Sequence, residues 1–282
     1  MENHSNKTQV EDHQESNEVE KTKICLMRTF VETQDPSSKE VDDLTLRRFL
    51  RARDLDVEKA SGMFLKYLKW RRNFVPNGSI SPTQVCNEIK QNKMFLQGSD
   101  KKGRPISVLF AARHFQHKGG VEEFKRYIVY IFEKIFARMP PGQEKFDVIA
   151  DLQGWGYANC DIRAYLAALS LVQDYYPERL GKVFIVHAPY IFMTAWKIVY
   201  PFIDNKTKKK VCTASYKWEA KCSMFNLKGR RDGTLVLGII IRVRAVYEHQ
   251  TDLTPVTTVA TKQKSLMGHS HEGCFISTEL FG

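Results

Sequence analysis

Two aspartates are the first candidates for catalytic chemistry in this sequence. Asp151 and Asp174 are carboxylates of the kind that work as a general acid and base, but no histidine lies near them in sequence to orient them. The closest, His187, follows an apolar run and is expected at a strand end or core edge. Gly154 and Gly156 lack the third glycine of a dinucleotide-binding turn, and neither G-x-S-x-G nor a phosphate-binding loop occurs. These residues do not predict an enzyme.

The cysteines predict neither a metal site nor a disulfide framework. The six cysteines are scattered without a C-x-x-C pair, and the N-terminus has no apolar segment of the secretory type. His269 and His271 lie near Cys274, but zinc sites of known type need a second closely spaced pair. We therefore expect reduced thiols, no metal and no cofactor.

Composition and charge narrow the class of protein. The 282 residues include 43% hydrophobic ones and carry a formal net charge of +11, as in an ordinary but basic globular protein. The longest apolar run, Leu235 to Ile241, is far shorter than the roughly 18 residues of a membrane span. A basic protein favours nucleic acid or an anionic membrane surface as its partner, and charge alone does not separate the two.

The N-terminal region predicts a tail followed by helices. Residues 1–22 are polar and charged, with little to bury, so we expect a disordered tail. A helical lobe is expected over residues 23–80. Ser37 and Glu40 have the spacing of a capping box that opens one helix, and Asp56 is expected to cap the next.

Strands and helices alternate through residues 94–203, which predicts an α/β sheet with helical cover. Two apolar runs flank the turn at Asp100–Gly103 and predict two paired strands. Phe146–Leu152 predicts a third strand, and Lys182–Ala188 is a continuous apolar run typical of a strand buried on both faces. Helices are expected over residues 121–139, 161–175 and 191–203.

Several segments, taken in order, resemble the CRAL-TRIO lipid-binding family. They are TLRRFLRARDLDVEKASGMFLKYLKWRR, DKKGRPI, DLQGWG, YYPERLGKVFIVHAPYIFMTAWKIVYPFID and TKKK, between about residues 40 and 211. They look most like the yeast-type phosphatidylinositol/phosphatidylcholine transfer branch. The resemblance implies a helical N-terminal lobe followed, over residues 81–211, by an α/β lobe with a mixed, mainly parallel sheet. In this family that lobe encloses one lipid under a mobile helical gate, without catalysis.

The resemblance also implies a set of headgroup-binding residues. Arg53, Glu178, Thr207 and Lys210 match family residues that surround the phosphoinositol headgroup. Arg53 and Lys210 would face the phosphate, and Glu178 would accept hydrogen bonds from ring hydroxyls. The alternatives are that Glu178 pairs with Arg179 or caps a helix end, and that Lys210 is one more solvated lysine.

Large apolar residues supply material for a pocket as apolar as the lipid interior. Periodicity alone favours a solid core for them, and the resemblance assigns them to the acyl pocket and gate. Ala195–Ile203 matches the gate segment, and its apolar face with the lysines that follow suits a helix on an anionic membrane. The assigned residues are Phe110, Tyr127, Phe132, Phe184, Phe192 and Trp196.

Three positions and the C-terminal part depart from the family pattern. Asp54 stands where transfer proteins often have a second basic residue, and Phe146 and Val148 replace hydroxyl residues that meet phosphatidylcholine. We therefore expect phosphatidylinositol or a different hydrophobe as the ligand. Residues 212–282 form a divergent tail, and we hypothesise that they come from an alternative splice form or a mistaken gene model.

The sequence thus predicts a cytoplasmic, transiently membrane-associated monomer that binds phosphatidylinositol and transfers or presents it between membranes. Anionic membrane surfaces and lipid kinases are its expected partners, and nucleic acid is not. Three alternatives stay open. A carrier or sensor of a sterol- or tocopherol-like hydrophobe would keep the pocket but ignore Lys210. A nucleic-acid-binding protein would use the basic tail, although no recognition motif occurs. A product that lacks the end of the domain would not function.

Overall fold

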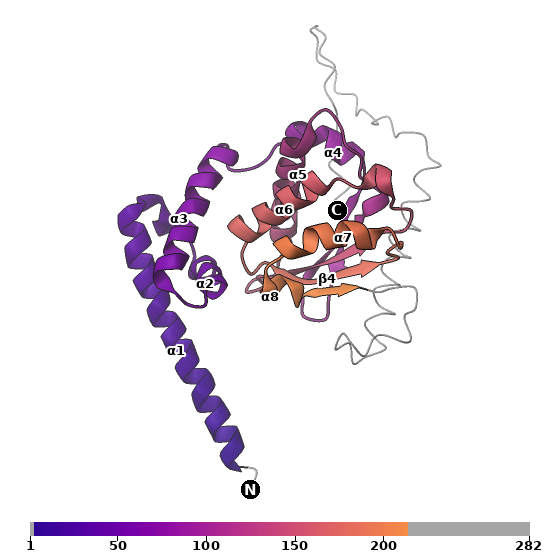
Figure 1. The fold of residues 1–282 in the computed structure, drawn as a ribbon. Helices are drawn as coiled ribbons and strands as arrows, with labels where there is room; N and C mark the ends of the chain where they lie inside the picture. Colours follow the sequence, from indigo (N-terminus) through magenta and orange to yellow (C-terminus); the bar gives the residue numbers. More distant parts are fainter. Residues whose placement is uncertain (1–2, 214–282) are drawn as a thin grey trace, which may run out of the picture. The chain divides into compact units, whose positions relative to one another are not determined.

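A computed structural model describes residues 3–213 of the chain, with side chains from residue 17 onward (Figure 1). The chain divides into two compact units. The first comprises the chain up to Ser79 and a later segment, Leu169–Leu180. The second comprises Ile80–Ala168 and the chain from Gly181 onward. The first unit is therefore built from two pieces that lie far apart in the sequence.

The first unit is built mainly from three helices with one apolar core. The side chain of Asp42 accepts a hydrogen bond from the Thr45 N–H at the start of α2, and Asp56 accepts one from the Lys59 N–H at the start of α3. The Asp56 cap was predicted. In the core, the rings of Phe49 and Phe64 meet edge to face, with centroids 5.2 Å apart. The elements are α1 (Asn3–Gln34), η1 (Pro36–Glu40), α2 (Asp43–Ala52) and α3 (Val57–Phe74).

The N-terminal segment differs from the expected disordered tail, since α1 begins at Asn3. The later part of α1 places Ile24, Met27 and Val31 in the core at helical spacing. The preceding residues continue that helix and include many Glu, Gln and Lys, which have good helix propensity. Low hydrophobicity therefore did not predict the backbone conformation of this segment.

The expected capping box at Ser37 also differs from the structure. The side chain of Asp35 accepts from the Ser37 N–H and caps the short 3₁₀ helix η1. The following α-helix, α2, starts only at Asp43. Asp35 caps η1 and Asp42 caps α2, whereas the spacing of Ser37 and Glu40 predicted that Ser37 would be the capping residue.

The segment Leu169–Leu180 completes the first unit. It contains the second half of α6 (Ile162–Tyr175). The ring of Trp70 stacks on Tyr175 with centroids 4.1 Å apart and planes at 6°. Lys66 Nζ lies 3.2 Å from Asp174 Oδ2. Asp174 therefore pairs with a lysine of α3 and has a structural explanation.

The second unit contains a mixed sheet with the strand order β1-β2-β3-β4-β5. The antiparallel β1–β2 pair joins a parallel β2–β3 pair, and β4 and β5 are also parallel. This confirms the predicted α/β fold with a mixed, mainly parallel sheet. The strands are β1 (Met94–Ser99), β2 (Pro105–Phe110), β3 (Phe146–Asp151), β4 (Leu180–Val186) and β5 (Val211–Thr213).

Helices connect these strands close to the predicted positions. The helix expected over residues 191–203 is two elements, because Pro201 has no N–H with which to continue an α-helical ladder. Figure 1 shows α7 beside strand β4. The elements are η2 (Pro82–Val85), α4 (Cys86–Lys90), η3 (Ala111–Arg113), α5 (Gly120–Phe136), η4 (Tyr157–Asn159), α7 (Phe192–Val199), η5 (Tyr200–Phe202) and α8 (Asn205–Lys208).

Strand β4 differs from the expectation of burial on both faces. Ile185 and Val186 are buried, whereas the strand residues before them are only partly buried. The apolar run correctly predicted a strand. It did not predict that the first five residues of that strand would be only partly buried.

Candidate functional site

The two faces of the sheet are packed to different degrees. One face carries a cluster of six buried residues from β1 to β4, including Val108 and Ile149, with a single partly buried member, Phe184. Residue Ile185, which alternates with Phe184 and Val186 along β4, belongs to a second cluster with α7. In this second cluster, here called the α7 cluster, five residues are buried and ten are partly buried. Close-packed cores bury most of their members, so the α7 cluster is more accessible to solvent than the cluster on the other face.

Helix α7 supplies aromatic side chains to this cluster. Ala195 is buried against the sheet, and Phe192 and Trp196 are partly buried beside it. The ring of Phe192 lies 6.0 Å from that of Trp155 and 5.7 Å from that of Trp196. Two residues predicted for the pocket and gate, Phe192 and Trp196, therefore meet at the α7 cluster.

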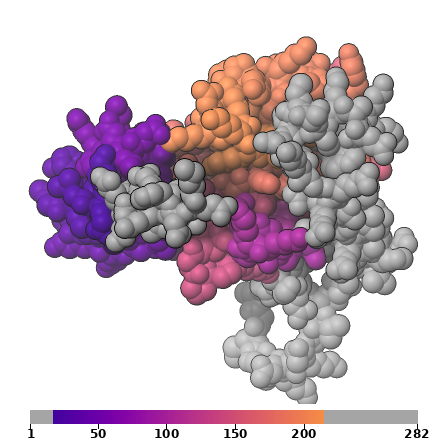
Figure 2. Space-filling view, turned by 90° about the horizontal axis from the view of Figure 1, so that it is seen from below, coloured from indigo at the N-terminus to yellow at the C-terminus, as the bar shows by residue number. Residues whose placement is uncertain are grey.

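The outer surface of the α7 segment exposes large apolar side chains. Met193 and Ile198 of α7, and Tyr200 and Phe202 of η5, are all exposed. Figure 2 shows this part of the chain, coloured orange, at the surface of the molecule. A short helix with apolar residues on both its inner and outer faces is typical of a segment with more than one environment.

Thr207 and Lys210, two of the predicted headgroup residues, lie close together after α7. Asp204 caps α8 by accepting a hydrogen bond from the Thr207 N–H. The Lys210 N–H donates to the Thr207 carbonyl, and the Lys210 carbonyl accepts from the Val183 N–H of β4. These backbone hydrogen bonds fix both residues at the edge of the sheet.

Arg53 lies in the first unit, at the end of α2. It is exposed and is followed by Asp54 and Leu55, whose φ angles of 51° and 63° lie in the left-handed region. The turn is held because the Leu55 N–H donates to Leu50 and the Leu55 carbonyl accepts from Lys23 Nζ at 2.9 Å. Two successive non-glycine residues in this region are strained, which is a frequent property of functional turns.

Glu178, the fourth predicted headgroup residue, also lies in the first unit. It is partly buried in the turn between α6 and β4 and has a φ of 57°. A left-handed glutamate is uncommon and requires support from its surroundings. The structure thus places Arg53 and Glu178 in one unit and Thr207 and Lys210 in the other.

The other predicted pocket residues are not members of the α7 cluster. Phe110 and Phe184 belong to the well-packed cluster on the opposite face of the sheet. Tyr127 and Phe132 are buried on α5, where the Phe132 ring lies 5.2 Å from that of Phe146. Their assignment to the acyl pocket stays a prediction, and their present contacts are those of core residues.

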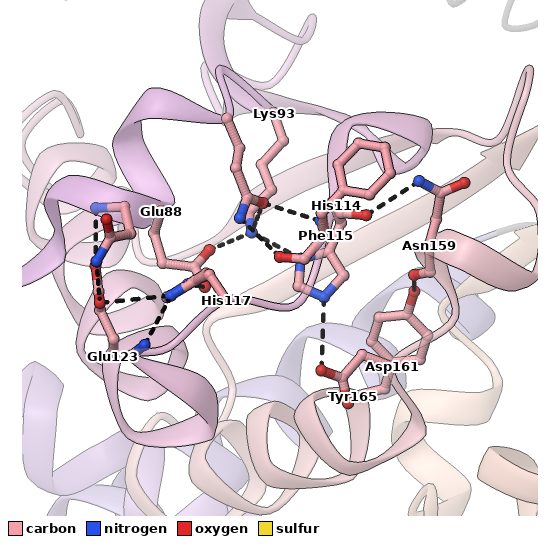
Figure 3. A network of polar contacts seen from close by, with 12 residues as sticks. Glu88, Lys93, His114, Phe115, His117, Glu123, Asn159, Asp161 and Tyr165 are labelled. Atoms are coloured by element: carbon pink, nitrogen blue, oxygen red, sulfur yellow. Dashed lines mark hydrogen bonds and ion pairs between the residues drawn. The ribbon is translucent and has the colours of Figure 1, made fainter.

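A network of buried polar side chains lies beyond the carboxyl ends of β2 and β3 (Figure 3). Glu88 and Lys93 form an ion pair in which each side chain is 1% exposed. Lys93 Nζ lies 2.8 Å from His114 Nδ1, and Glu88 Oε1 lies 2.7 Å from His117 Nε2. A cavity of about 60 Å³ adjoins these groups and is also lined by Asp161. The network joins α4, the residue just before β1 and the loop after β2.

The electrostatics of this network keep His114 neutral. Burial and, after it, the positive charge of Lys93 lower the pKa of His114 to about 4. Because Lys93 donates to Nδ1, the ring proton lies on Nε2. That atom has no hydrogen-bond partner among the described residues, and Asp161 Oδ2 lies 3.9 Å away. The arrangement is suited to a structural role, since the His114 lone pair is already occupied.

Asp151 and His187 form a pair that the sequence analysis missed. His187 Nδ1 lies 2.9 Å from Asp151 Oδ1, and Asp151 is buried at the end of β3. The Leu152 N–H donates to the Val186 carbonyl, so the ends of β3 and β4 lie side by side. The available signal was positional, because both residues stand where neighbouring predicted strands end.

Comparisons with known proteins decide the family. The profile of the CRAL/TRIO N-terminal domain matches residues 8–66, and that of the CRAL/TRIO domain matches residues 89–226. A CRAL-TRIO domain-containing protein of Saccharomyces cerevisiae is 30% identical over 231 residues, which cover 70% of this chain and 72% of that protein. The chain belongs to the CRAL-TRIO family.

Other CRAL-TRIO relatives confirm the Sec14-like branch. The Sec14 cytosolic factor of Schizosaccharomyces pombe is 31% identical over 195 residues, which cover 61% of this chain and 66% of that protein. "Protein real-time" of Aedes aegypti is 30% identical over 210 residues, but the match spans only 32% of its length. The crystal structure of Sfh5 superposes with a TM-score of 0.56 at 18% identity, covering 70% of this chain and 80% of that one, which supports the fold.

Membership in the CRAL-TRIO family makes lipid binding the function of this chain in broad terms. No helix within residues 3–213 is long and apolar enough to span a bilayer. In the same part of the chain, no group of three His, Cys, Asp or Glu side chains is placed to hold a metal ion. The run Leu235 to Ile241 and the group His269, His271 and Cys274 lie outside the described residues.

Proposed function

We propose that this CRAL-TRIO chain binds phosphatidylinositol beneath α7 and transfers or presents it between membranes. The observation that carries the proposal is the α7 cluster, in which ten apolar or amphipathic residues are only partly buried. Acyl chains placed there would remove this apolar surface from water at about 25 cal/mol per Å². The proposed role of the protein is that of a carrier and not of an enzyme.

Helix α7 is the proposed gate. Its inner face contributes Phe192 and Trp196 to the α7 cluster, and its outer face exposes Met193 and Ile198. A gate helix that opens onto a bilayer needs apolar residues on its inner face, for the closed position, and on its outer face, for the position in the bilayer. The lysines that follow, Lys206 to Lys210, supply positive charge for an anionic membrane surface. A peripheral, cytoplasmic location fits this mechanism, and one relative is named a cytosolic factor.

The headgroup would be held by Arg53, Glu178, Thr207 and Lys210. The cationic pair supplies charge for the phosphodiester, and Glu178 supplies an acceptor for inositol hydroxyls. The fixed backbones of Thr207 and Lys210 and the left-handed conformation of Glu178 support such a role, because binding sites use residues held in defined positions.

Phosphatidylcholine is a weaker candidate ligand. The positions expected to offer hydroxyl groups are Phe146, which is buried against Phe132 and Phe136, and Val148. Neither side chain has a hydrogen-bonding group for a choline phosphate. A sterol- or tocopherol-like hydrophobe needs no such group and remains the second candidate for the same pocket.

The test is native mass spectrometry with lipid extraction on the full chain, expressed in a eukaryotic host. We expect phosphatidylinositol to co-purify at near one-to-one stoichiometry. A neutral hydrophobe in its place would keep the pocket and overturn the phosphatidylinositol assignment. A folded protein that carries no lipid, and takes none from vesicles containing phosphatidylinositol, would overturn the proposed function.

A further inference from the structure

Three exposed aromatic side chains follow the ends of three neighbouring strands. Phe115 follows β2, Tyr157 follows β3 and Tyr190 follows β4, and they are 50%, 83% and 96% exposed. Strands β2 and β3 are parallel and in register up to Phe110 and Asp151, so their loops leave the same edge of the sheet. None of the three aromatics belongs to the α7 cluster or to the proposed headgroup set.

The loops that carry these aromatics are fastened to one another. Asn159 Nδ2 donates to the carbonyls of Ala112 and His114, at 2.8 and 3.1 Å, and so joins the β3 loop to the β2 loop. The rings of Trp155 and Phe192 join the β3 loop to the start of α7. Residues 111–120, 152–161 and 187–191 therefore form one connected surface, here called the strand-end rim.

The exposed charged residues of the strand-end rim are basic. Lys118 and, just beyond the rim, Arg163 are exposed. The only acidic residue in the three loops is Asp161, which is 7% exposed and lines the cavity beside His114. Glu122, in the first turn of α5, pairs with Lys125. The rim thus presents aromatic and basic groups to solvent.

We propose that the strand-end rim is a membrane-docking surface that binds anionic phospholipid bilayers, independently of the lipid held under α7. Tyrosine and phenylalanine rings on a basic surface match the chemistry of the membrane interface, where the ring reaches the acyl boundary and the hydroxyl meets headgroups. Basic side chains beside them are attracted to anionic lipids. The rim is also continuous with α7, since Tyr190 lies two residues before Phe192.

A bilayer fits the rim better than a protein partner does. Protein interfaces centre on packed pockets that accept anchor residues, whereas these rings come from three separate loops and stand in solvent. The rim contains no exposed acidic group to select a basic partner and no repulsion toward an anionic one. A bilayer surface needs no complementary shape, so each exposed ring can insert into it separately.

Vesicle flotation of the full chain tests this surface. The probes are vesicles of phosphatidylcholine alone and of phosphatidylcholine mixed with phosphatidylserine. We expect Phe115→Ala, Tyr157→Ala and Tyr190→Ala each to weaken binding to the mixed vesicles about tenfold, the effect of leaving roughly 55 Å² of apolar surface unburied. The matched control is Phe30→Ala, because Phe30 is 47% exposed on α1 of the first unit.

Charge reversal gives a second, independent measurement. Lys118→Glu and Arg163→Glu are expected to weaken binding to the mixed vesicles at least about fivefold each, and to reduce its dependence on salt. Lys101→Glu is the control, since Lys101 is exposed in the turn before β2, at the opposite end of that strand. Binding to pure phosphatidylcholine vesicles should change little in all three charge variants.

The outcomes separate this inference from the proposed function. If the rim variants bind mixed vesicles as tightly as the unmodified chain, the strand-end rim is not a membrane-docking surface. A rim that contacts a protein instead of a bilayer would give this result. Equal losses with Phe30→Ala or Lys101→Glu would also overturn the docking surface. Vesicle binding that needs the rim in a chain that carries no lipid would support the rim while the proposed function fails. Unfolding temperatures check that these exposed substitutions leave the fold intact.

Discussion

At the scale of single residues, His114 links stability to pH. Its pKa in the folded protein is lowered to about 4 by burial, against about 6.5 in an unfolded chain. Between these values the unfolded state binds a proton that the folded state does not, so stability falls as the pH drops from about 6.5 to about 4. The loss from this residue amounts to roughly 3 kcal/mol.

Urea unfolding at a series of pH values measures this effect. The variant His114→Gln keeps an acceptor for Lys93 but does not titrate, so we expect its unfolding free energy to be flatter across that range. An identical pH slope in the variant and in the unmodified chain would show that other groups cause the acid sensitivity.

Headgroup recognition is also argued at the residue scale. Glu178→Lys and Lys210→Glu each remove one proposed charge-assisted contact, worth about 1.5–3 kcal/mol, and place the wrong charge there. We expect phosphatidylinositol uptake from vesicles to fall by at least about tenfold in each variant. Lys209→Glu is the matched control, because it changes the charge of the neighbouring exposed lysine. Equal uptake by Lys209→Glu and Lys210→Glu would refute a specific role for Lys210.

At the scale of elements, the start of β4 requires a glycine, because there is no room for a side chain at Gly181. A Cβ at Gly181 would overlap Asp147 Oδ1 and approach the Phe146 carbonyl to 3.1 Å. Asp147 accepts hydrogen bonds from the Lys182 N–H and from Arg104, so the overlap disturbs the attachment of β4 to β3. We expect Gly181→Ala to lower the free energy of unfolding by about 2 kcal/mol.

A second glycine provides the control for this prediction. A Cβ at Gly62, inside α3, meets nothing within 4 Å. Gly62→Ala should therefore raise the free energy of unfolding by about 0.5–1 kcal/mol through helix propensity. Thermal and urea unfolding of both variants measure the two signs. A neutral Gly181→Ala would mean that β4 tolerates a shift at its first residues.

Local signals predicted most elements, and long-range contacts account for the rest. Asp56 and the apolar periodicity after it specified α3, and the glycine-containing turn specified the β1–β2 pair, because those determinants lie within a few residues. The pairing of Asp151 with His187 and of Glu88 with Lys93 depends on which strand ends and loops meet. Family resemblance supplied the headgroup set, for which spacing alone offers no signal.

At the scale of the whole molecule, the two pieces of the first unit are separated along the chain by part of the second unit. The first unit includes residues 169–180, which are synthesised after residues 80–168 of the second unit. The Trp70–Tyr175 stack and the Lys66–Asp174 ion pair therefore form between segments separated by about a hundred residues. Contacts of high sequence separation form late, because loop closure must precede them.

This arrangement predicts the behaviour of a chain cut between the units. A protease site inserted after Asn77, in an exposed turn, can be cleaved in the folded protein. We expect the two fragments to elute together in gel filtration, because the N-terminal fragment still contacts residues 169–180. Tyr175→Ala removes the stacked ring and should weaken fragment association at least about tenfold. Separation of the fragments without that substitution would contradict the prediction, because it would show that the contacts with residues 169–180 do not hold the cut chain together.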